Sequence, residues 1–163
     1  MRSKVAVKRH PIHPMLVAFP VAFYCSTLVA FALAALGADP ETFWFRTGTY
    51  ANVAGVITAL IAAVPGLIDW MYSIPPGTPA KRTGAKHMAA NLAALTLFIA
   101  NMFVQLGQAG TPPPSYSMAV GLPLVGVLLT AIAGWYGFQM VQTHHVGVDL
   151  TREQEDIDVR VGR

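Results

Sequence analysis

The stretch MLVAFPVAFYCSTLVAFALAALG, residues 15–37, contains no charged side chain and is apolar over most of its length. A helix that crosses a bilayer needs about 20 consecutive, mainly apolar residues, so this stretch is long enough to span. It is also too long to be the apolar core of a signal peptide, which is about 7–15 residues. The stretch therefore predicts a membrane-spanning helix close to the N-terminus.

Three more apolar runs follow, at residues 47–72, 88–107 and 118–142. Asp69 is the only charged residue within these three runs. The connections between the runs are polar or rich in Pro and Gly, such as QAGTPPP at 108–114, which cannot continue a helix. Four spans joined by short connections predict an antiparallel bundle.

The domain plan that follows has three parts. We expect a basic N-terminus at residues 1–14, an all-α, four-helix transmembrane bundle at 15–145 and a polar tail at 146–163. Lys and Arg are concentrated before the first run, in the connection at 73–86 and in the tail, and Arg46 alone lies at the other end of the bundle. The positive-inside rule then predicts that both termini are cytoplasmic.

The composition agrees with a membrane protein. Hydrophobic residues make up 54% of the chain and charged residues only 12%, about half the share of a soluble domain. The net charge of +3 comes from a few Lys and Arg beside apolar runs rather than from a basic face, so no nucleic acid partner is expected. Cys25 has no second cysteine with which to form an internal disulfide.

The histidines are the first candidate ligands. All five fall at the predicted cytoplasmic ends of the helices: His10, His13, His87, His144 and His145. Asp69 ends the second run at the same face. At about 100° per residue, His144 shares a helical face with the small residues of the fourth run, so we prefer it to His145. No role is assigned to His10 or His145.

A polar stripe runs along the third helix. His87, Asn91, Asn101 and Gln105 fall on one side of it, and this side should face the interior because lipid cannot satisfy polar groups. We also expect His87 to begin this helix, where the helix dipole disfavours its protonated form.

The spacing indicates an internal duplication. The interval from His13 to Asp69 is one residue shorter than the interval from His87 to His144. Two hairpins inserted in the same orientation would be related by a pseudo-two-fold axis along the membrane normal, with His13 opposite His87 and Asp69 opposite His144. The second and fourth helices carry faces of small residues, which either pack closely against a neighbour or leave room for a flat cofactor.

Two cofactor geometries fit these residues. Haem b could be held between His13 and His87, and Asn91, one turn after His87, is the third candidate cofactor-binding residue. A non-haem Zn or Fe ion could instead be held by four side chains: His13, Asp69, His87 and His144. Either site predicts a redox or metal-binding protein of electron-transfer type, and haem is the preferred alternative.

Two other functions remain open. The polar stripe could serve proton relay or small-solute transport, for which four helices would have to form a homo-oligomer. The polar residues could also only anchor and staple the bundle of a structural membrane subunit. Motifs of soluble enzymes, such as GxSxG, HExxH and a Gly-rich phosphate loop, do not occur, so no catalytic residue is assigned.

Several segments together resemble one family. They are HPIHPMLVAFP at 10–20, PGLIDW at 65–70, His87 with Asn91, and HHVGV at 144–148. In this pattern the chain is similar over residues 10–148 to the bacterial membrane family catalogued as domain of unknown function 2231. It departs at the last motif, where the family pattern reads His-Gly-Val-Gly-Val. The resemblance implies a multi-pass protein of the bacterial inner membrane, associated with electron-transfer partner proteins.

Overall fold

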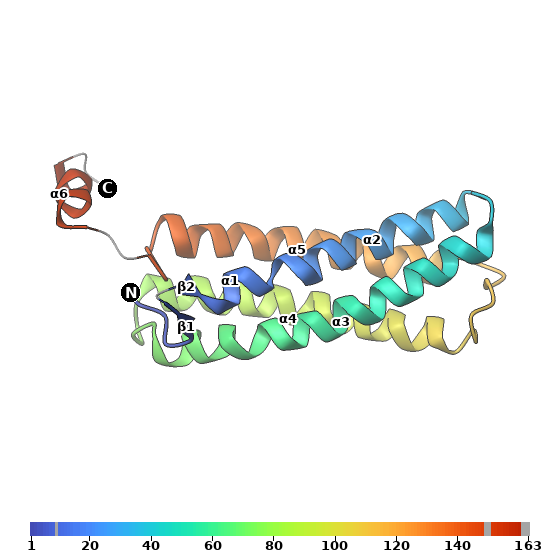
Figure 1. Ribbon diagram of the computed structural model, residues 1–163, viewed down its shortest axis with the longest axis horizontal. Coiled ribbons are helices and arrows are strands. Elements are labelled where there is room, and N and C mark those ends of the chain that lie inside the picture. The colour runs from blue at the N-terminus through green and yellow to red at the C-terminus, as the bar shows by residue number, and fades with distance from the viewer. Residues whose placement is uncertain (9, 149–150, 161–163) are drawn as a thin grey trace.

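The structure is a computed structural model that describes residues 1–8, 10–148 and 151–160. A short hairpin pairs β1 (Ala6–Val7) antiparallel with β2 (His10–Pro11) and leads into the first span. The helices follow in chain order: α1 (Ile12–Leu16), α2 (Ala18–Ala35), α3 (Glu41–Tyr72), α4 (Pro79–Leu106), α5 (Ser117–Gln142) and α6 (Arg152–Arg160). The long helices lie side by side along the longest axis (Figure 1).

Four spans within the described residues are long and apolar enough to cross a membrane: Ile12–Ala35, Glu41–Tyr72, Pro79–Leu106 and Ser117–Gln142. They alternate in direction, so the start of the chain and the end of α5 lie at the same end of the bundle (Figure 1). The predicted four-helix membrane bundle is therefore confirmed. The short α6 lies beyond this end, within the polar tail.

The first span contains a break. Helix α1 ends at Leu16, and α2 begins at Ala18 after Val17. Pro20 has no backbone N–H to offer the carbonyl of Leu16, so the regular hydrogen-bond ladder cannot pass this point. The break separates the short helix that carries His13 from the long helix that crosses the bundle.

Two helices begin earlier than the apolar runs predict, α3 at Glu41 and α4 at Pro79. Thr78 caps α4 by accepting the N–H of Lys81, and Pro79 occupies the first turn, where its missing N–H costs nothing. The polar turns that follow extend the helix beyond its apolar part. The expected helix start at His87 was therefore wrong, and the dipole argument made for His87 does not apply.

Aromatic and imidazole rings of one helix cover glycines of the next within each hairpin. In the first hairpin, a Cβ added at Gly48 of α3 would lie 2.7 Å from the ring of Phe31. A Cβ added at Gly55 would lie 2.8 Å from the ring of Tyr24. In the second hairpin, a Cβ at Gly126 of α5 would lie 2.6 Å from Phe98. The faces of small residues on α3 and α5 thus serve close packing, because rings from α2 and α4 already cover these glycines.

The two hairpins meet at a pair of stacked rings. Helix α2 neighbours α3 and α5, and α4 neighbours α5 and α3, so α2 and α4 stand diagonally across the bundle. Tyr24 and Phe98 bridge this diagonal with their ring centroids 3.6 Å apart and their planes inclined by 2°. The two rings therefore lie face to face, and this contact joins the two hairpins in the interior of the bundle.

The packing has the predicted pseudo-two-fold pattern. Tyr24 and Phe98 are separated in the sequence by the same number of positions as His13 and His87. The positions that they contact on the following helices are likewise shifted by one common interval: Gly55 and Gly126, Ala62 and Ala133, and Gly66 and Gly137. Two hairpins of the same orientation therefore build the bundle, as in parallel-repeat membrane proteins.

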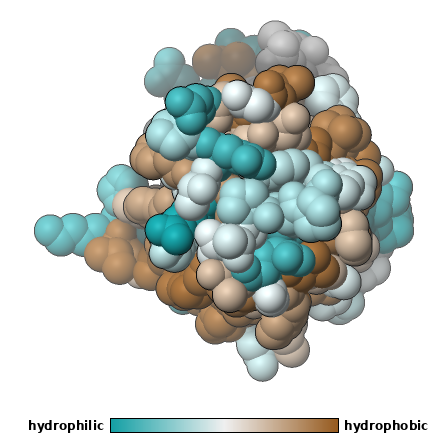
Figure 2. All heavy atoms as spheres, turned by 90° about the vertical axis from the view of Figure 1, so that its right-hand side faces the viewer, coloured by the Kyte–Doolittle hydropathy of each residue, from teal (hydrophilic) through white to brown (hydrophobic). Residues whose placement is uncertain are grey.

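The sides of the bundle are apolar, whereas the end that lies opposite the chain's start is polar. Large apolar residues are exposed along the helices, including Phe19, Phe103 and Phe138. Figure 2 shows polar residues gathered on the end that carries the loops before α3 and α5, with apolar residues around it. At this end Tyr116 donates a hydrogen bond of 2.9 Å to Glu41, and burial together with Glu41 raises the pKa of Tyr116 to about 12.

Candidate cofactor site

His13 is held against the second span by a backbone carbonyl. It lies in the single turn of α1, directly after the β-hairpin, and its Nδ1 is 2.8 Å from the carbonyl oxygen of Ala62. The ring rests on Gly66, where an added Cβ would come within 2.8 Å of it. Because Gly66 has no side chain, the imidazole can approach the helix closely enough to reach this carbonyl.

His87 repeats this arrangement in the second hairpin. Its Nδ1 is 2.8 Å from the carbonyl oxygen of Ala133, and its ring packs on Gly137. On both α3 and α5, an alanine supplies the carbonyl, and a glycine one turn later leaves it uncovered. This pair of Ala-x-x-x-Gly segments was present in the sequence and could have identified both histidines as anchored residues.

These hydrogen bonds fix the tautomer of both rings. A carbonyl oxygen can only accept, so Nδ1 must carry the proton in His13 and in His87. The lone pair of each neutral ring is then on Nε2, the nitrogen left to bind a metal or accept a proton. Histidines that bind metals almost always donate their other N–H to a carbonyl or carboxylate in this way.

The two rings lie next to each other across the bundle. Their centroids are 6.1 Å apart, and their planes are nearly perpendicular, at 87°. Both side chains are partly buried. The structure therefore brings together His13 and His87, one from each hairpin, at equivalent positions about the pseudo-two-fold axis.

Asn91 is the polar neighbour of this pair. Its Nδ2 lies 3.1 Å from His87 Nε2 and donates a second hydrogen bond to the backbone carbonyl of His87. Because Nε2 of His87 is the acceptor, the amide covers the lone pair at which a metal would bind. Asn91 was expected to face the interior with the rest of the polar stripe, but it is exposed, so its side chain can turn away without disturbing the core.

The pair lies deeper than the ends of the helices. Helix α4 has 28 residues and is about 42 Å long, whereas the apolar core of a bilayer is about 30 Å thick. His87 follows Pro79 by about 12 Å along the axis of α4. The apolar run 88–107 begins directly after His87, so the pair lies at the edge of the apolar core, while the ends of α3 and α4 extend into the headgroup region.

Asp69 binds the N-terminal segment. Its Oδ2 accepts a hydrogen bond of 2.6 Å from Ser3, and its Oδ1 accepts one of 2.7 Å from the backbone N–H of Lys4. Val5 N–H and the hydroxyl of Ser73 also donate to Oδ1. The carboxylate therefore fastens the strand-like segment that leads to His13.

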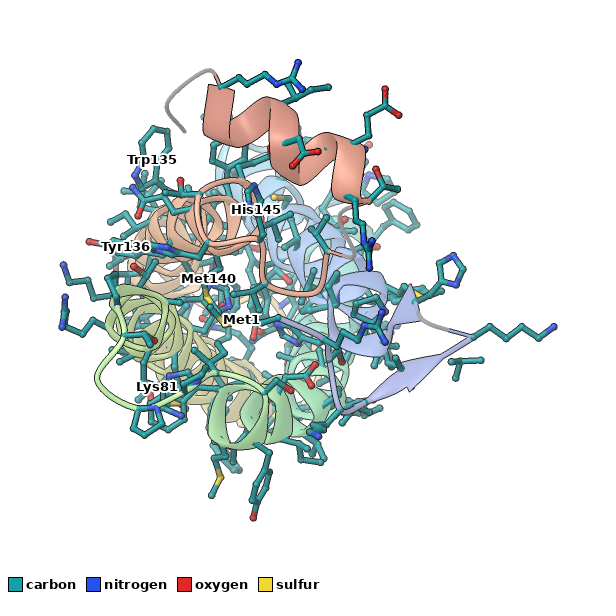
Figure 3. All side chains as sticks on the ribbon, turned by 90° about the vertical axis from the view of Figure 1, so that its left-hand side faces the viewer. Met1, Lys81, Trp135, Tyr136, Met140 and His145 are labelled. Atoms are coloured by element: carbon teal, nitrogen blue, oxygen red, sulfur yellow. The ribbon has the colours of Figure 1, made fainter. Side chains whose placement is uncertain are left out.

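The remaining histidines have separate surroundings. His144 lies beyond the end of α5, with Nε2 3.2 Å from the hydroxyl of Thr83. The ring of His10 contacts the carbonyl of Lys8. The backbone carbonyl of His145 accepts a hydrogen bond from the amino group of Met1, and both residues are labelled in Figure 3. Within the described residues, no group of three or more His, Cys, Asp or Glu is arranged to hold a metal ion.

Asp69→Asn should release the N-terminal segment. The variant places an amide N–H₂ among four donors and loses charge-assisted hydrogen bonds, which are worth about 1.5–3 kcal/mol each. We expect faster hydrogen exchange at the backbone amides of Lys4 and Val5, measured by mass spectrometry on the reconstituted protein. Asp39→Asn, at an exposed carboxylate of the opposite end, is the matched control and should leave both amides protected.

The buried amide of Asn52 was not singled out from the sequence. Asn52 of α3 is completely buried between Gly48 and Gly55 on the face that packs against α2. Its signal was available, because it is an amide in the middle of an apolar run, at helical spacing from two glycines. Asn101 and Gln105, which were expected to face inward, are also buried.

Comparison with known proteins identifies the family. Neither the search of curated proteins nor the search of solved structures gave a match. The sequence model of a family described as predicted membrane protein (DUF2231) matches residues 9–150. This range includes the paired histidines, their carbonyl partners and all four spans. The chain therefore belongs to the DUF2231 family of predicted membrane proteins.

Proposed function

We propose that the protein binds haem b through His13 and His87 and transfers electrons. The observation that carries the proposal is the anchored pair itself: two imidazoles, one from each hairpin, with Nδ1 of each ring held by a carbonyl and Nε2 as the remaining ring nitrogen. Fixed tautomers of this kind are the usual preparation of histidine for metal binding.

The number of protein ligands favours haem over a bare ion. A structural or catalytic Zn site takes three or four protein ligands, but the described residues offer this site two. Asp69 and His144 are occupied by Ser3 and Thr83. Two imidazoles would be sufficient protein ligands for haem.

The two rings are close enough for both histidines to contact one bound group. Their centroids are 6.1 Å apart. The rings are partly buried and stand between the hairpins rather than within one of them, so a flat group would enter from the side of the bundle.

Haem held by two histidines would supply one-electron chemistry. His13 and His87 would bind and orient it, and the apolar span residues would exclude water. The concentration of Lys and Arg at this end supports a cytoplasmic location for both termini and for the site, in a bacterial inner membrane. The partners would be other electron-transfer proteins.

A solute pathway along α4 has less support. Such a pathway would have to pass from His87 to Asn101, and the stacked rings of Tyr24 and Phe98 cross the interior between these levels. The polar residues of α4 are therefore divided between two separate parts of the bundle.

Absorption spectroscopy of the purified protein tests the proposal. After expression with sufficient haem, we expect a Soret band and sharp α and β bands on reduction, with about one haem per chain by pyridine haemochrome assay. Elemental analysis of the same sample should give iron in the same ratio. A protein that is folded in detergent, shows no Soret band and does not take up added haemin would overturn the proposal.

A further inference from the structure

A second polar site lies in the other half of the bundle. Asn52, Asn101 and Gln105, which we call the amide cluster, are at most 2% exposed. Asn52 is on α3, one turn from Gly55, which contacts Tyr24. Asn101 is on α4, one turn beyond Phe98. Because Tyr24 and Phe98 stack, Asn52 and Asn101 lie at similar depth in the interior, on the side of the ring stack away from the histidines.

The cluster does not satisfy its own hydrogen-bonding groups. Gln105 Nε2 donates a hydrogen bond of 3.0 Å to Asn101 Oδ1. Among the described residues, the buried side-chain atoms without a partner are Tyr24 Oη, Asn52 Nδ2, Asn52 Oδ1, Asn101 Nδ2 and Gln105 Oε1. Turning both linked amides over would exchange their roles and again leave one donor and one acceptor free.

Such groups are costly in the middle of a membrane. Each buried polar group without a partner costs free energy, and lipid offers no hydrogen bond in exchange. Asn52 presents an amide nitrogen and an amide oxygen, and both lack a partner. We propose that the amide cluster is a binding site for internal water, which bridges Asn52 to Asn101 and Gln105.

The chemistry of the free atoms selects water. The guest must accept from the amide nitrogens of Asn52 and Asn101 and donate to the amide oxygens of Asn52 and Gln105. Water does both, and buried waters typically make about three hydrogen bonds to such groups. A cation would satisfy only the oxygens and an anion only the nitrogens. The buried residues that the structure describes include no charged side chain to balance either ion.

The site is separate from the paired histidines. The stack of Tyr24 on Phe98 fills the interior between them, with Gly55 and Gly126 packed against its two rings. The water site therefore does not depend on haem binding, and it can be tested in protein without haem.

Radiolytic hydroxyl labelling detects bound water directly. X-ray irradiation converts water into hydroxyl radicals, which modify the side chains beside them. In the full chain in lipid nanodiscs, we expect Tyr24 and Phe98 to be labelled several-fold more than Phe103, which is 67% exposed toward lipid on the same helix as Phe98. Labelling of Tyr24 and Phe98 no greater than that of Phe103 would overturn the proposal.

A stability measurement provides the second test. Asn52→Leu keeps the branched shape and removes the central polar partner, so it should lower Tm by about 2–6 °C and abolish labelling of Tyr24. If nothing bridges the cluster, the same variant removes two unpaired buried groups and Tm should rise, which would contradict the proposal. Thr27→Val is the matched control, because the buried Thr27 hydroxyl already donates to Phe23 O and should shift Tm little.

A cation in place of water would have its own signature. Tm would then increase with the concentration of Na⁺ or K⁺. The ionic strength is kept constant with the salt of an organic cation that is too large to enter the amide cluster. This dependence would overturn the water site, whereas a constant Tm across these salts supports it.

Discussion

His13→Ala and His87→Ala will each lose haem, whereas Asn91→Leu will retain it. Each histidine has its ring fixed by its own carbonyl, and no third His, Cys, Asp or Glu of the described residues joins the pair in a metal-binding group. Loss of an outer-shell partner already costs metal sites about 10–100-fold in affinity, and loss of a ligand itself should cost more. Pyridine haemochrome assay on each purified variant measures the result.

Asn91→Leu separates ligation from local packing. Asn91 donates to His87 Nε2, so its removal frees the lone pair that the iron would take. We expect haem content equal to that of the wild type and equal or tighter binding of added haemin. His10→Ala is the histidine control on the exposed β-hairpin and should keep full haem content. Haem loss in Asn91→Leu but not in His87→Ala would contradict the assignment of ligands.

The second large effect concerns the fit of rings on glycines. Gly126→Ala would put a methyl group 2.6 Å from the ring of Phe98. The ring cannot move aside, because its other face is stacked on Tyr24. Overpacking of this kind costs about 1–3 kcal/mol, so we expect a clearly lower Tm in detergent, measured by a thermal shift assay with intrinsic fluorescence.

Gly134→Ala on the same helix is the control, and it should not destabilise the protein. Its added Cβ meets nothing within 4 Å, and alanine is favoured over glycine within a helix by about 0.5–1 kcal/mol. Tm should therefore stay constant or rise slightly. Equal destabilisation by Gly126→Ala and Gly134→Ala would show that helix propensity, rather than the contact with Phe98, governs both positions.

The spans were predictable because a bilayer imposes a length and an apolar composition on every helix that crosses it. The starts of α3 and α4 were not found by the same criterion, since helices continue into polar segments outside the apolar core. For α4 the local signal existed in Thr78 and Pro79, which cap its first turn. Hydropathy alone locates the membrane-embedded part of a helix, and capping residues locate its ends.

The site was predictable in part, for a similar reason. His13 and His87 follow from helical register and from the duplication, and the structure places them together. The sequence spacing predicted that Asp69 and His144 occupy equivalent positions in the two hairpins. The structure makes Ala62 equivalent to Ala133, and the same interval makes Asp69 equivalent to Met140 instead. Three of the four partners of Asp69 come from residues 3–5, an extended segment whose path over the end of the bundle no helical period describes.

The repeat of two spans has a consequence for the symmetry of the interior. A unit with an even number of crossings re-enters the membrane in its original orientation, so equivalent positions of the two hairpins lie at one depth. Equivalent positions need not carry the same residue. Tyr24 and Phe98 occupy equivalent places in the two halves, yet only the former carries a hydroxyl, so the two sides of the bundle are chemically distinct.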